Sequence, residues 1–372
     1  MWEQEAEKMY LKNEHLEKVI SFCQKQQEKT SFVFTMKKWN ELSKNTFFLF
    51  QSKLENLDNN YNYKQMAEVL MVLGEFYDDI GMIFAMNNHL WACKNVIAKF
   101  GSEDLKEKYL WKLGNGNCIG GFALTEPNSG SDAFSLRTKY QKGDHIYLLN
   151  GRKRFISNAP IADVMIVIAK EDSKQGMQSL NAFVVDMNQQ GISVDKIEKA
   201  GLQSCPFGDI VLENYEISEK NMIGKKGSGA IIVNYALEME RCFEFASYIG
   251  SLKKMLKIVL DIGRIIKLEQ EERFFIGELA TVIDIAEQYL YFLADMKDQD
   301  KLIYKNASMF KLFVSLRKLY ADTGIGPLHI LWKMRLPHKM IKQRSARWSP
   351  IVSGSLRREM RVLILDVPMC IG

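Results

Sequence analysis

The chain changes its residue pattern twice along its length, and this change constrains the fold more than any other feature. From residue 1 to about 115, apolar residues recur at three- and four-residue spacing, as in amphipathic helices, and the first proline is Pro127. Between about 118 and 223, short β-rich runs alternate with turn residues. From 230 to about 345 the helical pattern returns. We therefore expect three domains, at 1–117, 118–223 and 224–372.

The β-rich runs of the middle region are HIYLLNG, DVMIVIA, NAFVVDM and GDIVLENYEI. Turn residues separate them, with no helical pattern between, which favours an antiparallel β domain over βαβ units. Before this region, GSEDLKEKYLWKL offers Ser102 as an N-cap, followed by acidic residues in the first turn. The sequence thus predicts an α+β chain in which a helical bundle carries an inserted β domain.

The charge and hydropathy of the chain exclude two classes of partner. The 50 Lys+Arg and 45 Asp+Glu residues give a net charge of +5 over 372 residues, too dilute to favour nucleic acid or an anionic membrane. No run approaches the ~18 apolar residues of a membrane span, and the charged start lacks the apolar core of a signal peptide. We expect a soluble cytoplasmic protein.

Neither cysteines nor histidines form a metal-binding pattern. The six cysteines are scattered, with no C-x-x-C pair, which fits a reducing compartment and predicts no metal site. The five histidines are too far apart in sequence for a local metal motif. A P-loop, a third glycine at Rossmann spacing and a G-x-S-x-G elbow are all absent from the sequence. P-loop, nicotinamide and serine hydrolase chemistry are therefore not indicated.

Two segments of the middle region carry a more specific signal. Residues 120–132 are GGFALTEPNSGSD and residues 150–159 are NGRKRFISNA. With KFGSEDLKEKYLWKLGNG before them and KAGLQSCPFGDIVLENYEISEKNMIGKKGSG after them, they resemble the signature segments of the acyl-CoA dehydrogenase family over roughly residues 60–260. The resemblance implies an FAD flavoprotein with an N-terminal helical domain, a barrel-like antiparallel β domain and a C-terminal four-helix bundle.

The resemblance also assigns the residues around the flavin ring: Phe122, Leu124, Thr125, Ser131, Phe155 and Ser157. Thr125 and its neighbours would line the pyrimidine side, Phe155 would cover one ring face, and Ser157 would hydrogen-bond near N5 or O4. Ser131 would sit where flavin and acyl chain meet. Taken alone, TEPNSGSD also fits an ordinary turn, because Pro, Asn, Gly and Asp are turn formers.

The catalytic base is expected at an unusual position for the family. Most members supply a glutamate from a Y-E-G-T segment near the C-terminus, whereas IVSGSLRREMR has Ser353 there. A subset of the family places the base in an L-x-x-E-R pattern on the first helix after the β domain, and ALEMERCFEF matches it with Glu240 and Arg241. Glu240 would be the base, and Arg241 would hold the carrier's phosphopantetheine or a substrate carboxylate. The alternative is a solvated Glu–Arg surface pair.

The segments that bind the adenosine half of FAD in the family are altered here. Arg264, in DIGRIIKLEQEERFF, is a candidate replacement for the usual arginine. The later glycine-rich segment, ADTGIGPL, retains Gly324 and Gly326 but has no glutamine. If these residues act across subunits, the protein is a homodimer or homotetramer.

The resemblance implies an FAD-dependent acyl-thioester dehydrogenase. Glu240 would remove the α-proton while hydride passes to flavin N5. The substrate would be held on an acyl carrier protein, in the making of hydroxymalonyl- or aminomalonyl-type extender units for polyketide or nonribosomal peptide biosynthesis, with a CoA ester as the other form.

Two alternatives keep the fold. The chain could be a flavin-dependent oxygenase or oxidase, which needs no base at the thioester position and so tolerates Ser353. It could also be a non-catalytic binding protein, which the altered adenosine segments would favour. The electron acceptor is left open.

Overall fold

The computed structural model describes residues 14–26, 32–46 and 62–320, apart from 131, 133, 134, 145, 175, 200 and 265–267. Its N-terminal part is helical: α2 (Glu14–Gln26), α3 (Met36–Asn45), α4 (Tyr63–Phe76), α5 (Ile80–Asn87), the π-helical segment η1 (Asn88–Lys94), α6 (Asn95–Phe100) and α7 (Glu103–Gly114). The predicted cap of α7 is confirmed, because the Ser102 side chain accepts the Leu105 N–H at 3.3 Å.

The middle part holds the strands β1 (Gly120–Ala123), β2 (Lys139–Lys142), β3 (Ile146–Ser157), β4 (Val164–Glu171), β5 (Leu180–Asp186), β6 (Ile192–Ile197), β7 (Phe207–Ser218) and β8 (Met222–Ile223). Two 3₁₀ turns, η2 (Met177–Ser179) and η3 (Glu219–Asn221), lie in its connections. The order in the sheet is β6-β7-β3-β2-β4-β5-β8, with β1 also paired to β4.

The sheet departs in two respects from the antiparallel, barrel-like domain expected. Its described strands form an open sheet, and both β1 and β2 run parallel to β4, while the other pairs are antiparallel. The parallel pairs arise because the chain leaves β1, crosses to β2 and turns through β3 before β4 begins. Strand β1 therefore lies between β4 and the N-terminal helical part, where it contacts η1.

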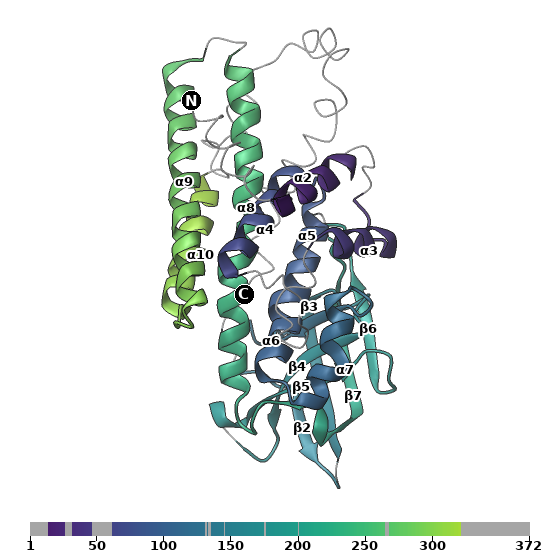
Figure 1. The fold of residues 1–372 in the computed structure, drawn as a ribbon. Helices are drawn as coiled ribbons and strands as arrows, with labels where there is room; N and C mark the ends of the chain where they lie inside the picture. The colour runs from purple at the N-terminus through teal and green to yellow at the C-terminus, as the bar shows by residue number, and fades with distance from the viewer. Residues whose placement is uncertain are drawn as a thin grey trace.

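The C-terminal part holds three described helices: α8 (Gly229–Gly263), α9 (Gln270–Asp298) and α10 (Tyr304–Tyr320). The rest of the expected four-helix bundle lies outside the described residues. Helix α8 packs against β4 and β5 near its start and runs from beside the sheet to the opposite end of the molecule (Figure 1). The predicted order of helical, β and helical regions is confirmed, whereas the domain boundaries stay a prediction.

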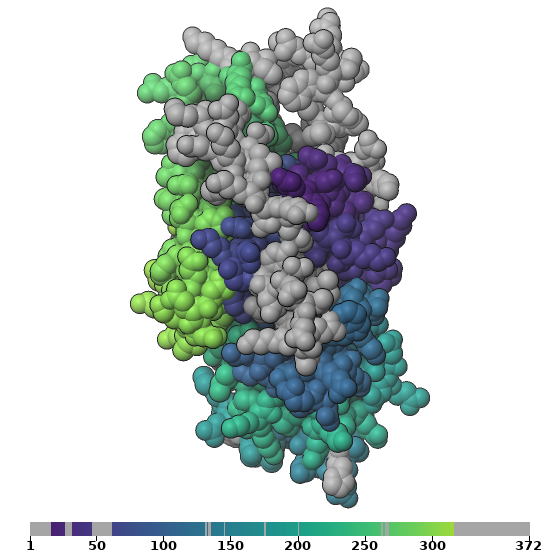
Figure 2. Space-filling model, in the orientation of Figure 1, coloured from purple at the N-terminus to yellow at the C-terminus, as the bar shows by residue number. Residues whose placement is uncertain are grey.

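Helices α4 and α8 cross at very short range. A Cβ added to Gly250 would lie 1.9 Å from the Met71 carbonyl oxygen, and one added to Gly74 would lie 1.8 Å from that of Ser247. Glycine at both positions lets the two backbones touch. The surface in Figure 2 shows α9 and α10 along one flank of this crossing. No helix in the described part of the chain is long and apolar enough to cross a membrane.

Candidate functional site

The two signature segments lie side by side. Arg154 N–H donates to the Thr125 carbonyl oxygen at 2.8 Å, and the Asn158 side chain donates to the Gly120 carbonyl oxygen at 3.2 Å. A Cβ added to Gly121 would lie 3.1 Å from the Ser157 carbonyl oxygen, so β1 and the end of β3 approach closely. The folding of the sheet therefore joins residues 120–132 and 150–159 into one site.

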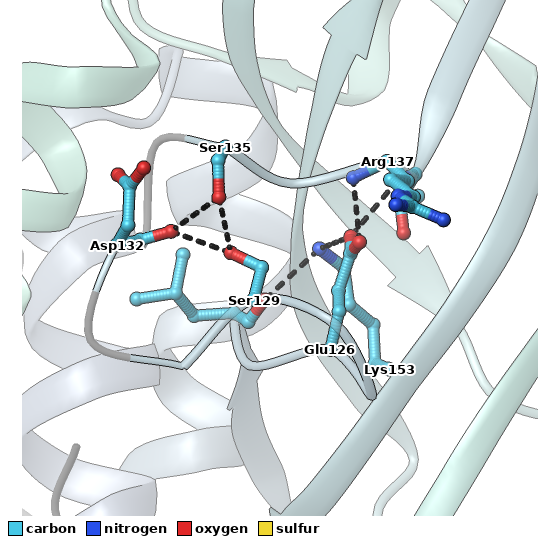
Figure 3. A network of polar contacts seen from close by, with 8 residues as sticks. Glu126, Ser129, Asp132, Ser135, Arg137 and Lys153 are labelled. Carbon is cyan, nitrogen blue, oxygen red and sulfur yellow. Dashed lines mark hydrogen bonds and ion pairs between the residues drawn. The ribbon is translucent and has the colours of Figure 1, made fainter.

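A buried ion pair ties these segments together (Figure 3). The Lys153 ammonium, fully buried on β3, donates to Glu126 Oε1 at 2.8 Å and to the Leu124 carbonyl oxygen at 3.1 Å. Glu126 also accepts the backbone N–H groups of Arg137 at 2.5 Å and Thr138 at 3.0 Å. In the sequence, Glu126 stands only as part of a turn, and no local pattern pairs it with Lys153, 27 residues later.

Burial and pairing set the charges of this ion pair. Desolvation lowers the pKa of Lys153 to about 8, while Glu126 opposes that change. For Glu126, burial acts to raise the pKa, but the Lys153 charge and the hydrogen bonds from Lys153, Thr138 and Arg137 together hold it below its ordinary value. Both groups therefore carry charge at neutral pH, and the pair fixes the backbone that leaves β1.

The turn after β1 has the geometry of an ordinary tight turn as well. Glu126 and Ser129 exchange backbone hydrogen bonds at 3.0 and 3.2 Å, and the Ser129 hydroxyl donates to the Asp132 carbonyl oxygen at 2.5 Å (Figure 3). The turn interpretation and the signature interpretation are thus compatible. Ser131 lies outside the described residues.

The residues expected to meet the flavin ring, Ser131 apart, lie in the two segments that meet at this junction. Phe122, Leu124 and Thr125 are partly buried, Ser157 is buried at the end of β3, and Phe155 is half exposed. Phe155 also has a left-handed backbone, with φ of 58°. Within the described part of the chain, the hydroxyls of Thr125 and Ser157 have no hydrogen-bond partner. Two uncommitted hydroxyls and an accessible aromatic ring in segments that meet suit a planar heterocycle with polar edges.

A second group of polar residues lies on α8 and α10. Glu240 is partly buried, and Glu244, one turn later on the same face of α8, is buried. Burial raises the pKa of Glu240 to about 7, against the Lys311 and Arg241 charges. Burial, then the neighbouring Glu240, raises the pKa of Glu244 well above its ordinary value, against Lys311. A carboxylate with this proton affinity suits general base chemistry near neutral pH.

The π-helical segment links this acidic pair to the signature segments. The Asn88 side chain donates to Glu244 Oε1 at 3.5 Å, and the adjacent His89 accepts the Gly120 N–H at Nδ1 over 2.9 Å. His89 Nε2 lies 2.9 Å from the Leu113 carbonyl oxygen, and burial lowers the pKa of His89 to about 3. His89 is therefore a neutral, satisfied core residue. The roles of Asn88 and His89 escaped the sequence analysis, because a π-helical segment leaves no period in the pattern.

Of the other predicted site residues, Arg241 belongs to this group on α8 and α10, whereas Arg264 does not. Arg241 Nη1 donates to the Ser308 hydroxyl at 3.2 Å, which joins α8 to α10. Arg264 follows the end of α8, 24 residues after Glu240, or about 36 Å along the helix, and is exposed beside Asp261. Gly324, Gly326 and Ser353 lie outside the described residues.

Comparison with known proteins identifies the family. The model of the acyl-CoA dehydrogenase middle domain matches residues 121–215. The crystal structure of the prolyl acyl carrier protein oxidase AnaB is 30% identical and has a TM-score of 0.81, over 94% of this chain and 92% of that one. The chain belongs to the acyl-CoA dehydrogenase family. The resemblance inferred from the signature segments, and the fold class, are confirmed.

Two further proteins resemble this family member. An acyl-CoA dehydrogenase from Bacillus subtilis (strain 168) is 36% identical over 244 residues, which cover 63% of this chain and 64% of that protein. The structure of PigA with FAD and proline is 25% identical, with a TM-score of 0.77 over 92% of this chain and 88% of that one. This family member thus spans somewhat less than two thirds of the Bacillus relative's length but nearly all of the AnaB fold.

Proposed function

We propose that the chain is an FAD-dependent dehydrogenase of acyl thioesters carried on an acyl carrier protein, with Glu240 as the base. The observation that supports this most is the position of Glu240: it stands in the L-x-x-E-R pattern, on a helix beside the sheet, with a pKa raised to about 7. The likeness to AnaB, a prolyl acyl carrier protein oxidase, supports the carrier-bound substrate. Free buried cysteines fit the proposed cytoplasmic location.

The residues present fit an FAD. The uncommitted hydroxyls of Thr125 and Ser157 would hold the polar edge of its ring, and Phe155 would cover a face. Phe122 and Leu124 would line the apolar part. The PigA structure with FAD and proline supports this assignment by likeness. When bound, FAD would accept the hydride that leaves the substrate.

The chain's own residues would handle the proton. Glu240 would take the α-proton of the thioester, and its raised pKa brings its basicity closer to what that weakly acidic proton requires. Lys311 would limit the rise and keep part of Glu240 ionised at neutral pH. We propose that Arg241 meets the substrate's carrier arm or a substrate carboxylate, and that Ser131 lies at the meeting of flavin and acyl chain.

The identity of the acyl group is a finer proposal. The likeness to AnaB and to PigA, whose structure holds proline, favours a prolyl thioester on the carrier. The hydroxymalonyl and aminomalonyl thioesters expected from the sequence remain predictions for the same assay. Each substrate should be offered on a carrier protein and as its CoA ester.

The decisive experiment measures the reduction of the bound flavin by substrate without oxygen, monitored through the loss of flavin absorbance. Wild type should be bleached by at least one carrier-bound substrate, and Glu240→Gln should slow this by at least about 100-fold, as loss of a general base does. Glu107→Gln, an exposed glutamate on α7, is the matched control and should react at the wild-type rate. A wild-type rate in Glu240→Gln would refute the base, and a colourless wild-type protein would favour a non-catalytic binding role.

A second candidate function is an oxidase that passes electrons to O2. The likeness to AnaB, which is an oxidase, is the observation that favours it. Oxygen consumption coupled to substrate turnover would identify this function, whereas reduced flavin that is stable in air would identify a dehydrogenase with a separate acceptor.

A further inference from the structure

Phe155 adopts a backbone conformation that bulky side chains avoid. Its φ of 58° lies in the left-handed region, and the register between β3 and β7 shifts between Lys153 and Ile156. Such a conformation persists only where the surrounding structure imposes it, and it is concentrated at functional sites. The ring is nevertheless half exposed, so packing of the ring in a core does not explain the conformation.

One buried carboxylate on the neighbouring strand meets this bulge. Asp209, on β7, has a side chain only 5% exposed, and its Oδ1 accepts the Phe155 N–H at 3.2 Å. Its Oδ2 accepts hydrogen bonds from the Arg152 guanidinium at 2.9 and 3.3 Å. Asp209 therefore binds the backbone of the bulge at Phe155 and the side chain of Arg152, which precedes the bulge.

The residue between them adds a further contact. Arg154 Nε lies 3.9 Å from Asp209 Oδ2, and its guanidinium carbon lies 4.8 Å from the centre of the Phe155 ring. The Arg154 N–H binds the Thr125 carbonyl oxygen, so the same short stretch also anchors the first signature segment. The position of the Phe155 ring is thus fixed from the backbone, from Asp209 and from its neighbouring cation.

We propose that Asp209 is a positioning residue for the flavin, which acts by holding Phe155 in the left-handed conformation and so sets the direction in which its exposed ring points. This inference rests on the proposed function, because it takes Phe155 as the residue that covers the flavin face. It assigns Asp209 a role that no sequence pattern indicated.

The test is a double-mutant cycle between Asp209 and Phe155, with FAD affinity and flavin reduction potential as readouts. Asp209→Ala should raise the Kd for FAD about tenfold, the scale of one lost charge-assisted hydrogen bond, and should shift the reduction potential. Phe155→Gly removes the ring and adopts a positive φ without strain. Adding Asp209→Ala to Phe155→Gly should then change neither quantity further.

The matched control is Asp195→Asn. Asp195 lies 3.5 Å from the same Arg152 guanidinium but is two-thirds exposed, so its loss should leave FAD affinity and potential unchanged. If Asp209→Ala weakens FAD binding by the same factor with Phe and with Gly at position 155, Asp209 does not act through Phe155 and the inference is wrong. An unchanged Kd and potential in the single variant would also overturn it.

A second measurement separates this inference from the proposed function. In the protein without FAD, Asp209→Ala should lower the urea midpoint more with Phe at position 155 than with Gly, because only Phe needs to be held at positive φ. A wild-type chain that takes up no FAD would refute the flavin proposal, and equal drops in midpoint would refute the role of Asp209 toward Phe155.

Discussion

Glu240 and Glu244 illustrate how two identical side chains, one helical turn apart, acquire different environments. Glu244 is buried and receives the Asn88 side chain, whereas Glu240 is partly open and is affected by both Lys311 and Arg241. Lys311 on α10 interacts with both carboxylates, and burial is the main cause that lowers its own pKa. The proton affinity of the proposed base is therefore a property of this small group of charges.

The first prediction is the pH dependence of flavin reduction. Because a base must be ionised to act, the rate should rise with pH through about pH 7, the raised pKa of Glu240. Lys311→Met removes a charge that lowers this pKa and should move the rise to higher pH. Rapid-mixing rates across the pH range measure this shift.

The control for this prediction is Lys305→Met, an exposed lysine on the same helix. Its profile should superimpose on that of wild type. A profile of Lys311→Met that stays in place or moves to lower pH would contradict the assignment of charges.

The second prediction concerns the ion pair between Lys153 and Glu126. Lys153→Met leaves the Glu126 carboxylate buried without its cation, which should lower the free energy of unfolding by about 3 kcal/mol or more. Lys139→Met breaks an exposed pair with Asp172 and should cost less than about 1 kcal/mol. Urea unfolding measures both losses of stability. Equal losses in the two variants would show that the buried ion pair contributes no more to stability than the exposed one.

At the scale of elements, the crossing of α4 and α8 fixes the helix that carries Glu240. The carbonyl oxygens of Met71 and Ser247 occupy the space that side chains at positions 250 and 74 would need. Ser251 adds a hydrogen bond across the crossing, from its hydroxyl to the Gly74 carbonyl oxygen at 3.0 Å.

The third prediction is that Gly250→Ala destabilises the protein, although alanine favours helices. The added methyl would collide with backbone, which does not yield as a side chain does, so we expect a loss of about 1–3 kcal/mol. Gly277→Ala on α9 is the matched control, since nothing lies within 4 Å of its added Cβ, and it should stabilise by up to about 1 kcal/mol. Thermal or urea unfolding compares them, and a stabilised Gly250→Ala would contradict the crossing.

The sequence predicted those elements that leave a local pattern. Ser102, the helical and β regions and the grouping of residues 120–132 with 150–159 all follow from spacing or from signature segments. The parallel pairing of β1 and β2 with β4 depends on contacts between distant strands, and the π-helical segment inserts its extra residues without a change of composition. Lys153 and Asp209 act through partners 27 and 54 residues away, which a single sequence does not connect.

At the scale of the whole molecule, the length of α8 separates Arg264 from the other predicted FAD contacts. Phe155 and Ser157 lie on β3, next to Asn158, which donates to the Ala85 carbonyl oxygen of α5, whereas Arg264 follows the end of α8, about 36 Å along the helix from Glu240. One FAD molecule in one subunit would have to span most of this helix to meet them all. We therefore expect Arg264 to serve the FAD of a neighbouring subunit.

The fourth prediction follows from this separation. The protein should sediment as a dimer or larger, and Arg264→Met should weaken FAD binding about tenfold, the scale of one charge-assisted hydrogen bond, without changing the sedimenting mass. Lys257→Met, another cation on α8, is the control and should bind FAD as wild type does. A monomer that binds FAD normally would contradict the shared site.

The close crossing of α4 and α8 at Gly74 and Gly250 has a consequence for how the proposed carrier arm would reach Glu240. Helix α8 cannot slide or roll at this point without a collision between two backbones, so we expect Glu240 to keep a constant distance from the sheet. Any widening needed to admit the arm must come from elements that pack through deformable side chains, such as α10. We therefore expect substitutions on α10 to change the range of substrates that this chain accepts, while the position of Glu240 on α8 stays the same.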